Sequence, residues 1–523
     1  LSGFPKPAES VHDAFIAGHA SNSVSVALGM ARARTLLGED RNIIALIGDG
    51  ALTGGLAYEG LSDAGASGEP LVVVLNDNGM SIDPNVGGVA EHLSRLRVRP
   101  GYYQFKKGYR AVLDRLPGGR RLYRFNHQVK SGVKRIIYPC SLFEDMGFTY
   151  LGPVDGHKIE QLCTTLSWAK ELGRPVLLHV RTRKGRGYPD AEARPEKCHG
   201  VPPFDPAVGI VEKQSIDFSY VLGHELVELA GEDKRVCAVT AAMADGAGLQ
   251  EFSAAWPKRF FDVGIAEGHA VSMSAGMAKQ GMIPVLAVYS TFLQRGYDML
   301  IHDVALQGLH VVLGVDRAGL VGPDGETHQG CFDALFLSEI PGFTVLCPSN
   351  FAEMRSMLRQ AVLAVTGPAA VRYPRGGEGA FQEDTSAEPV VCLRQGSGVT
   401  LLAYGLMVNN ALEAAELLHE RHGIEARVLK LNRIAPLDMD LLSPWFQGGE
   451  ILAVPEDAFG AGCVGQRIAA ILVEHEMAPR RLILNNLGMT FAPEGSVSQL
   501  EHSFGLDAAG IAAAVWEAAG HEQ

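Results

Sequence analysis

Short apolar runs alternate with longer segments of helical pattern along most of the chain, and the first region shows this most clearly. The segments "RNIIALIGDG" (41–50) and "EPLVVVLNDN" (69–78) each hold an apolar run bounded by turn-forming residues. Between them, "LTGGLAYEGLSDAGA" (52–66) has the composition of a helix. Strands that alternate with helices are typical of parallel sheets covered on both faces. We therefore predict a βαβ unit here and an α/β fold.

The same alternation continues in two further regions, separated by stretches without periodicity. The Pro-rich segment "HGVPPFDPAVG" (199–209) and the segment "RGGEGAFQEDTSAEP" (375–389) interrupt the pattern and are predicted to be linkers of low order. The strands predicted in the second region are "RVCAVTAA", "FFDVGI", "MIPVLAVY", "HVVLGVD" and "FTVLCPS", and those in the third are "GVTLLAYG", "EARVLKLN" and "GEILAVPE". The organisation predicted is three consecutive α/β domains with mainly parallel sheets, at residues 1–210, 211–385 and 386–523.

Composition narrows the functional classes. The 523 residues suffice for roughly three or four domains, and 47% apolar residues with 20% charged ones are ordinary for a globular protein. A formal net charge of −13 argues against a nucleic-acid partner, because phosphate neutralisation needs concentrated Lys and Arg. The basic stretch at 106–135 is an exception, for which a solvated loop is favoured over a polyanion site.

Cysteine spacing and hydropathy bear on the cellular compartment. The eight cysteines are scattered, with no CxxC pair, which predicts reduced thiols and neither a disulfide framework nor a zinc site. No uninterrupted apolar stretch is long enough to span a membrane. These features predict a cytoplasmic protein without a membrane partner.

Polar residues follow both strands of the first βαβ unit. Asp49 follows the first strand, and Asn78 follows the second strand 29 residues later. Since open α/β sheets bind ligands at the carboxyl ends of their strands, the two side chains are expected to meet there. A carboxylate, an amide oxygen and a backbone carbonyl at Met80 form a hard oxygen set suited to Mg²⁺, which completes its octahedron with phosphate oxygens and water. Glycines around Asp49 would let the backbone approach a diphosphate.

Each half of this pattern has a simpler explanation when taken alone. Asp49 could cap the following helix, and "NDN" (76–78) could be only a turn. Together, at βαβ spacing, the two halves favour the metal site. A GDG sequence followed about 30 residues later by a double-polar turn resembles the signature of thiamine diphosphate enzymes.

A thiamine enzyme also needs a carboxyl group that hydrogen-bonds the aminopyrimidine ring of the cofactor. Such a carboxyl works best in an apolar site that raises its pKa. In "FFDVGIAEGHAVSMSAGMA" (260–278), Glu267 is predicted to end a strand and open a helix of small residues. A Glu in the first turn of a helix could instead merely complement the helix dipole.

Aromatic and basic residues downstream provide candidates for substrate binding. Phe292 could pack on the pyrimidine, although taken alone an aromatic at this position is favoured as a core residue. Arg317 and Arg375 follow predicted strands, where guanidinium groups suit a phosphate-bearing substrate. Each of these arginines, and Arg295, could also be an ordinary surface cation.

The resemblance becomes closer than an enzyme class when the motifs are taken in order. "LSGFPKPAES", "DAFIAGHAS", "GDGALTGG", "LNDNGMSI", "EDMGFTYLGPVDGH", "KGRGY", "AEGHA", "YSTFLQRGYD", "DRAGLVGPDGETHQG" and "RYPRG" occur as they do in the 1-deoxy-D-xylulose-5-phosphate synthase family. The resemblance covers nearly the whole chain, and the run 289–330 is highly specific. It implies three α/β domains that bind thiamine diphosphate and Mg²⁺ and join pyruvate to D-glyceraldehyde 3-phosphate with loss of CO₂. The product would feed isoprenoid, thiamine and pyridoxal phosphate synthesis.

The resemblance also implies roles for individual residues. It implies catalytic roles for Glu267, His328 and His19; metal ligation by Asp49, Asn78 and the Met80 carbonyl; cofactor contacts at Gly18, His19, Ala20, Gly50, Ala51, Asn78, Ile82, Tyr188, Glu267 and Phe292; and substrate contacts at Tyr289, Arg295, Arg317, Asp324, His328 and Arg375.

Two departures and two alternatives accompany this interpretation. Ala20 stands where the family usually has Ser, so only a backbone contact is expected there. The family carries further active-site histidines in a segment before "LSGFPK", and without it the chain would have an open cofactor pocket and little activity. A transketolase-type enzyme is the nearest alternative, because it shares the domain order and a comparable "DGxTHQ" loop; an inactive thiamine diphosphate-binding fragment is the other. The family's habit implies a homodimer.

Overall fold

The computed structural model describes residues 2–80, 85–97, 141–201, 204–210 and 216–520, which form two compact units. The N-terminal unit comprises His19–Glu212 and Gly264–Ala266. The main unit comprises Leu1–Gly18, Lys213–Val263 and Glu267–Gln523. The basic stretch 106–135, predicted to be a solvated loop, lies outside the described residues.

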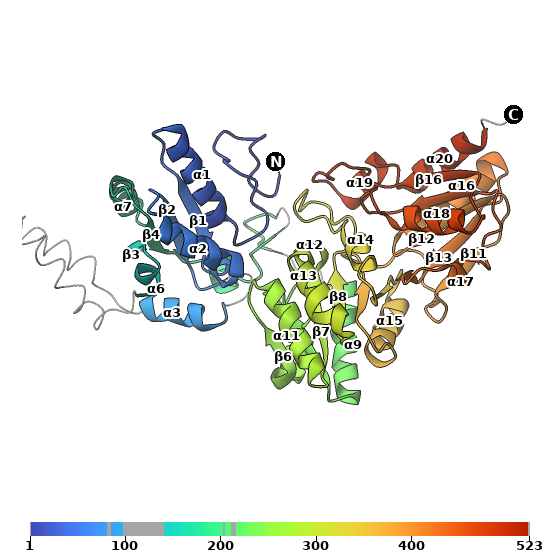
Figure 1. The fold of residues 1–523 in the computed structure, drawn as a ribbon, viewed down its shortest axis with the longest axis horizontal. Helices are drawn as coiled ribbons and strands as arrows, with labels where there is room; N and C mark the ends of the chain where they lie inside the picture. The colour runs from blue at the N-terminus through green and yellow to red at the C-terminus, as the bar shows by residue number, and fades with distance from the viewer. Residues whose placement is uncertain (1, 81–84, 98–140, 202–203, 211–215, 521–523) are drawn as a thin grey trace, which may run out of the picture. The chain divides into compact units, whose positions relative to one another are not determined.

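A four-stranded parallel sheet forms the centre of the N-terminal unit (Figure 1). Its strands, in spatial order, are β1 (Ile44–Gly48), β2 (Val72–Asp77), β4 (Val176–Arg181) and β3 (Thr149–Asp155). β1 and β2 pair in parallel, with α2 (Gly55–Ser67) between them in sequence, so the predicted βαβ unit is confirmed. The other described helices of the unit are α1 (Ser23–Leu37), η1 (Ala51–Thr53), α3 (Gly88–Arg97), α6 (Ser141–Asp145), α7 (Ile159–Glu171) and α8 (Pro189–Ala193).

Both faces of this sheet carry buried side chains, which explains why its strands are apolar nearly throughout. Val73 and Leu75 of β2 belong to a core that includes residues of α1 and α2. Val72, their neighbour on the opposite face, belongs to a second core that includes Ala169 of α7. Successive side chains of a strand point to opposite faces, so an apolar run is needed where helices cover both.

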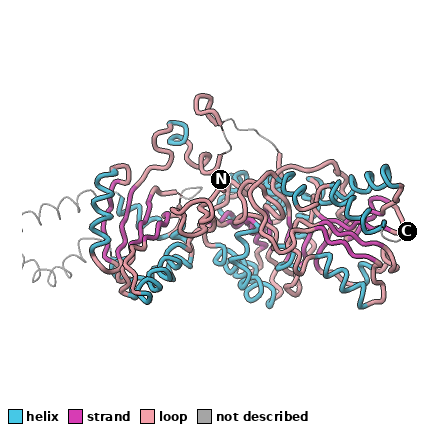
Figure 2. The backbone as a smooth tube through the Cα atoms, turned by 90° about the horizontal axis from the view of Figure 1, so that it is seen from above, coloured by secondary structure: helices cyan, strands magenta, loops and turns pink. Residues whose placement is uncertain are grey.

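The main unit contains two sheets. The seven-stranded sheet has the order β14 (Arg433–Ala435), β9 (Thr344–Leu346), β10 (Ala369–Arg372), β8 (Val312–Asp316), β7 (Ile283–Tyr289), β5 (Val236–Thr240), β6 (Phe260–Asp262), and only β14 is antiparallel to its neighbour. The five-stranded sheet has the order β11 (Val390–Arg394), β13 (Arg427–Leu431), β12 (Val399–Tyr404), β15 (Ile451–Pro455), β16 (Arg481–Asn485), with β11 antiparallel. Figure 2 shows the strands in magenta and the helices in cyan.

Helices flank both sheets of the main unit. Those that accompany the seven-stranded sheet are α9 (Phe218–Glu232), α10 (Gln250–Ala255), η2 (Pro257–Arg259), α11 (Glu267–Lys279), α12 (Ser290–Leu293), η3 (Gln294–Gly296), α13 (Tyr297–Met299), η4 (Leu300–Val304), η5 (Ala305–Gln307), α14 (Asp333–Ser338) and α15 (Phe351–Leu363). Those that follow in the chain are α16 (Met407–His422), α17 (Met439–Leu442), α18 (Val464–Glu474), α19 (Val497–Ser503) and α20 (Ala508–Gly520).

The observed architecture confirms the predicted α/β class with mainly parallel sheets. Every strand predicted in the second and third regions is present. The strands that the sequence pattern did not single out are β3, β4, β10, β11, β14 and β16. β14 lies within the third predicted region yet pairs with β9 of the seven-stranded sheet, a long-range contact that local periodicity does not reveal.

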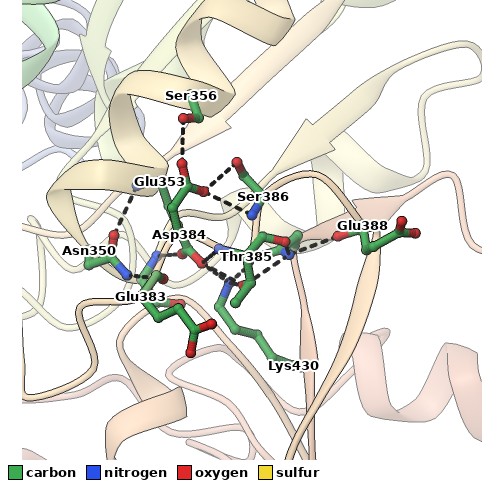
Figure 3. A network of polar contacts seen from close by, with 11 residues as sticks. Asn350, Glu353, Ser356, Glu383, Asp384, Thr385, Ser386, Glu388 and Lys430 are labelled. Carbon is green, nitrogen blue, oxygen red and sulfur yellow. Dashed lines mark hydrogen bonds and ion pairs between the residues drawn. The ribbon is translucent and has the colours of Figure 1, made fainter.

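The segment 375–389, predicted to be of low order, has no helix or strand but is held by a dense polar network (Figure 3). At its centre the fully buried Lys430 ammonium of β13 lies 2.6 Å from the Glu353 carboxylate of α15. The Thr385 hydroxyl donates to the same carboxylate at 2.7 Å, and the Asn432 amide donates to the carbonyls of Thr385 and Glu388 at 2.6 and 2.8 Å. The linker is thus ordered by side-chain contacts, which its Gly-rich composition did not indicate.

Candidate functional site

The turns after β1 and β2 meet, as predicted. The Asp49 carboxylate accepts a hydrogen bond from the Gly79 backbone N–H at 2.7 Å, and the Asp49 N–H donates to the Asn76 carbonyl at 3.1 Å. Asp49 is 2% exposed. The N-cap residues of η1 and α2 are Gly50 and Gly54, so Asp49 serves the neighbouring turn and is not the cap of either helix.

The donor set of these turns fits a hard divalent cation. Asp49 supplies carboxylate oxygens, and the amide oxygen of Asn78, next to Gly79 in the chain, accepts the Met80 N–H at 2.9 Å. This hydrogen bond uses the Met80 N–H and not the Met80 carbonyl, which is a separate acceptor. The bond also helps to fix the turn that contains this carbonyl. Carboxylate, amide and carbonyl oxygens are the ligands that Mg²⁺ takes beside phosphate. The residues therefore fit a magnesium diphosphate.

The segment that contains His19 and Ala20 lies against the same turn. Ser21, which follows them, is buried and has a positive φ of 77°. Its hydroxyl donates to the Ala51 carbonyl at 2.7 Å. The structure thus brings the residue that follows His19 and Ala20 into contact with Ala51. Ser21, which makes this contact, was not predicted from the sequence to belong to the site.

The other predicted cofactor residues of the N-terminal unit are Tyr188 and Ile82. Tyr188 follows β4 and is the N-cap residue of α8. Its described contacts are to Asp190, at 3.3 Å from the hydroxyl, and to the Phe204 ring. Ile82 lies outside the described residues.

In the main unit, Glu267 is the first residue of α11. The strand before it, β6, ends at Asp262, so the prediction that Glu267 ends a strand was wrong, whereas the prediction that it opens a helix is confirmed. Glu267 is 5% exposed, and burial raises the pKa of its carboxyl above the ordinary value. The Arg295 guanidinium, 3.8 Å away, opposes this shift but does not cancel it. Arg295 is therefore a partner of Glu267 and not only a surface cation.

An aromatic and basic cluster occupies the carboxyl ends of β7 and β8. The Arg317 guanidinium lies 3.9 Å from the centre of the Tyr289 ring, at the end of β7. Tyr289 stacks with Phe292 at 5.8 Å, and Phe292 meets the His328 imidazole edge-on at 5.4 Å. Phe292 also packs against the main apolar core, which agrees with its interpretation as a core residue; its contact with the pyrimidine stays a prediction. The four side chains thus form one continuous chain of contacts.

Asp324 joins the two arginines predicted to bind phosphate. Its Oδ2 accepts from Arg375 at 3.0 Å and lies 3.4 Å from an Arg317 nitrogen. β8 and β10 are parallel neighbours, which is why residues 317 and 375 emerge at the same edge. Two guanidinium groups on one carboxylate leave a net positive charge, as an anion-binding site requires.

Asp316 lies directly beneath this cluster and was not singled out from the sequence. It is the last residue of β8, is 0% exposed, and accepts a hydrogen bond from the Ser219 hydroxyl at 2.8 Å. Burial raises the pKa of Asp316 to about 7, against the opposing effect of Arg317.

The first residues of the chain form part of the same cluster. Phe4 stacks on His328, and the Lys6 ammonium lies 2.9 Å from Glu326. Gly18 approaches Thr327 so closely that an added Cβ would lie 2.1 Å from its hydroxyl. The segment 2–18 therefore packs on the loop 323–328. No periodic signal connects segments more than 300 residues apart, so this contact could not be predicted from the sequence.

Other site classes are not supported within the described part of the chain. The seven cysteines it contains are free thiols, as predicted; Cys140 lies outside it. No group of three or more His, Cys, Asp or Glu side chains in these residues is arranged to hold a metal ion. No helix in the described ranges is both long and apolar enough to cross a membrane.

Three family models match the chain in succession. Residues 1–182 match the model described as 1-deoxy-D-xylulose-5-phosphate synthase. Residues 214–377 match the pyrimidine binding domain of transketolase, and residues 389–511 match the transketolase C-terminal domain.

Curated relatives resemble the chain over almost its full length. A 1-deoxy-D-xylulose-5-phosphate synthase of Desulforudis audaxviator is 47% identical over 97% of this chain and 81% of its own length. A protein of the same name from Clostridium kluyveri is 45% identical over 98% of this chain and 82% of its own length.

Solved structures show a similar fold. A split-gene transketolase, described as an inactive β4 tetramer, is 26% identical with a TM-score of 0.51 over 59% of this chain and 100% of its own. The transketolase of Campylobacter jejuni is 18% identical, with a TM-score of 0.50 over 96% of this chain and 82% of its own.

Proposed function

The chain belongs to the 1-deoxy-D-xylulose-5-phosphate synthase family of thiamine diphosphate-dependent transferases, and we propose that it joins pyruvate to D-glyceraldehyde 3-phosphate with release of CO₂. Its product, 1-deoxy-D-xylulose 5-phosphate, would serve isoprenoid, thiamine and pyridoxal phosphate synthesis. The family's habit supports a homodimer, which light scattering of the purified protein tests.

The choice of substrates rests on the cluster formed by Arg317, Asp324 and Arg375. The cluster lies next to Tyr289, the last residue of β7. Ring contacts from Tyr289 to Phe292 and from Phe292 to His328 connect it to the imidazole. A phosphate forms bidentate hydrogen bonds with guanidinium forks, so the arginines would hold the phosphate of the aldehyde. His328 would then donate or accept a hydrogen bond at an oxygen of the bound aldehyde.

The residues proposed to bind the cofactor are assigned by the chemical group that each would contact. Asp49, Asn78 and the Met80 carbonyl would hold Mg²⁺ and, through it, the diphosphate, while Gly50 and Ala51 supply backbone close to the phosphates. Glu267 would hydrogen-bond the aminopyrimidine ring. When bound, thiamine diphosphate supplies a nucleophilic carbon at C2 of its thiazolium ring and accepts the electron pair released as CO₂ leaves.

The burial of Glu267 is what suits it to this role. A carboxyl group whose pKa is raised by an apolar environment retains a proton at pH values where an exposed Glu has lost it. It can therefore hold a proton against a ring nitrogen. Arg295, at 3.8 Å, orients the carboxylate when that proton is given up.

The activity is tested with purified protein, thiamine diphosphate and Mg²⁺. Formation of 1-deoxy-D-xylulose 5-phosphate from pyruvate and glyceraldehyde 3-phosphate is the expected result. Two-carbon transfer from a ketose phosphate, with pyruvate inert, would instead identify a transketolase-type enzyme, and cofactor binding without either reaction would identify an inactive binding protein.

Glu267→Gln tests the assignment of the proton-holding group. The variant should keep thiamine diphosphate bound but slow deuterium exchange at C2 by about a hundredfold or more, the scale of a lost acid or base. Glu251→Gln, at an exposed position of α10, is the matched control. Unchanged exchange in Glu267→Gln would move the role to another carboxyl group.

A further inference from the structure

A buried chain of three polar side chains crosses the sheet of the N-terminal unit and ends beside the Asn78 turn. The Tyr150 hydroxyl of β3 lies 2.7 Å from His179 Nδ1 of β4. His179 Nε2 lies 2.8 Å from the Asp77 carboxylate at the end of β2. The three residues are 4%, 0% and 1% exposed.

The register of the strands explains how the three side chains meet. His179 pairs with Leu75, two residues before Asp77, and Tyr150 pairs with Leu177, two residues before His179. Because side chains of a strand alternate between faces, all three lie on the face that packs against α1 and α2. A neutral imidazole with its proton on Nε2 satisfies both hydrogen bonds at once.

Packing alone does not account for these residues. Their neighbours on the same face are apolar, among them Leu75 and Leu177. A buried polar group gains little stability from its hydrogen bonds compared with an apolar group of the same shape, and an unsatisfied one is costly. The three buried polar side chains therefore indicate a role other than stabilising the core.

This role is found at the turn 76–79, where the chain of contacts ends. The Asp77 carbonyl accepts the Thr182 N–H at 2.9 Å, and the Thr182 hydroxyl donates to the Asn76 side chain at 2.7 Å. On the other side, Asp49 binds the Asn76 carbonyl and the Gly79 N–H. The backbone from 76 to 79 is thus held from β1 and from β4, and the Asp77 carboxylate, between these anchors, is held by His179.

We propose that Asp77, His179 and Tyr150 form a positioning relay that fixes the turn 76–80 and thereby sets its affinity for the divalent cation of the cofactor. The inference rests on the proposed metal site at Asp49 and Asn78. Residues that orient the ligands of a metal typically change its affinity ten- to a hundredfold when they are replaced. Neither His179 nor Tyr150 contacts the cation; both act through Asp77.

The test measures the Mg²⁺ concentration that half-saturates thiamine diphosphate binding, followed by calorimetry or protein fluorescence. His179→Phe should raise this concentration about ten- to a hundredfold. Tyr150→Phe, which removes one hydroxyl and keeps the ring, should raise it by a smaller factor. His179→Gln, which can still donate to Asp77, should recover part of the loss.

A structural control separates positioning from stability. Thr165 is 1% exposed and its hydroxyl donates to the Gln161 carbonyl within α7, which packs on the opposite face of the sheet. Thr165→Val should alter the melting temperature of the cofactor-free protein while leaving the Mg²⁺ dependence unchanged. A shift in Mg²⁺ dependence for Tyr150→Phe without a shift for Thr165→Val supports the relay.

Two results would overturn the proposal, and they differ. If the unaltered protein binds thiamine diphosphate without Mg²⁺, or if Asp49→Ala leaves the Mg²⁺ dependence intact, the metal site fails and the relay fails with it. If Asp49→Ala abolishes Mg²⁺-dependent binding but His179→Phe and Tyr150→Phe do not weaken it, the metal site stands and the relay alone is wrong. Should His179→Phe not fold, Tyr150→Phe decides.

Discussion

The ring of Phe4 lies flat on the imidazole of His328, with centroids 4.5 Å apart and 6° between the ring planes. His328 is also met edge-on by Phe292, and its Nδ1 lies 2.8 Å from the Thr327 hydroxyl. Two aromatic contacts and a hydrogen bond thus define the plane of this imidazole. One of the two rings comes from the first residues of the chain.

Replacing Phe4 should therefore loosen His328, which we propose binds the aldehyde substrate, and should leave cofactor binding unchanged. Phe4→Ala removes a stacked pair worth about 0.5–1.5 kcal/mol, so kcat/KM for glyceraldehyde 3-phosphate should fall about two- to tenfold. The KM for pyruvate should change little. Phe4→Tyr should retain activity, and Phe15→Ala, at a half-exposed position of the same segment, is the control. An equal loss for Phe15→Ala would show that only the docking of the segment matters.

Arg317 and Arg375 should contribute to binding of the aldehyde's phosphate and not to binding of pyruvate. Replacing either with Ala removes charge-assisted hydrogen bonds worth roughly 1.5–3 kcal/mol, or about ten- to a hundredfold in kcat/KM for glyceraldehyde 3-phosphate. Glyceraldehyde without phosphate should be a poor acceptor for every variant, with the penalty of the mutation largely absent. Steady-state kinetics with both acceptors measure this, with Arg355→Ala, an exposed arginine of α15, as control. Equal losses for the two acceptors would assign these arginines to the fold.

Asp316 should make the stability of the main unit depend on pH. Its pKa is raised from 3.8 to about 7 by burial, so the folded state holds the proton more tightly than the unfolded state. The stabilisation that this proton provides is complete below about pH 4 and is lost as the pH rises through about 7. The Asn side chain of Asp316→Asn cannot ionise. As the pH rises from 5 to 8, the free energy of unfolding of this variant should therefore increase relative to that of the unaltered protein.

The gain over this range should be about 2–3 kcal/mol, because about two of the three tenfold steps in proton affinity fall above pH 5 and each is worth about 1.4 kcal/mol. Urea unfolding at several pH values, with the exposed Asp298→Asn as control, gives the comparison. Parallel pH profiles for Asp316→Asn and the unaltered protein would contradict the assignment.

The buried pair of Lys430 and Glu353 should stabilise the main unit only as a pair. Lys430→Met leaves the Glu353 carboxylate buried without its cation and should lower the free energy of unfolding by about 3–5 kcal/mol. Adding Glu353→Gln removes the uncompensated charge and keeps one acceptor oxygen, for either the Ser349 N–H or the Thr385 hydroxyl, so the double variant should regain part of the loss. Lys258→Met, at an exposed position, is the control for denaturant unfolding. A double variant no more stable than Lys430→Met would show that the hydrogen bonds, and not the charge balance, are decisive.

Local pattern was enough to predict much of the scaffold and part of the candidate site. Apolar runs bounded by turn-forming residues predicted β1, β2, five strands of the seven-stranded sheet and three of the five-stranded sheet, because an apolar run between turns has few other stable solutions. The βαβ rule then placed Asp49 beside the Asn78 turn, and the strand ends placed Arg317 and Arg375 at one edge. These relationships depend on elements that are near in sequence or follow a repeated topology.

Only the tertiary structure decided the contacts between distant segments. Phe4 on His328, Lys430 with Glu353, and β14 against β9 join residues whose separations carry no periodic signal. Tyr150, His179 and Asp77 belong to strands that would be expected to be apolar, and their chain of hydrogen bonds exists only because β2, β4 and β3 are adjacent in one register. The physical reason is that periodicity reports which face of an element is buried, whereas the partner of a buried polar group is set by the order and register of the strands.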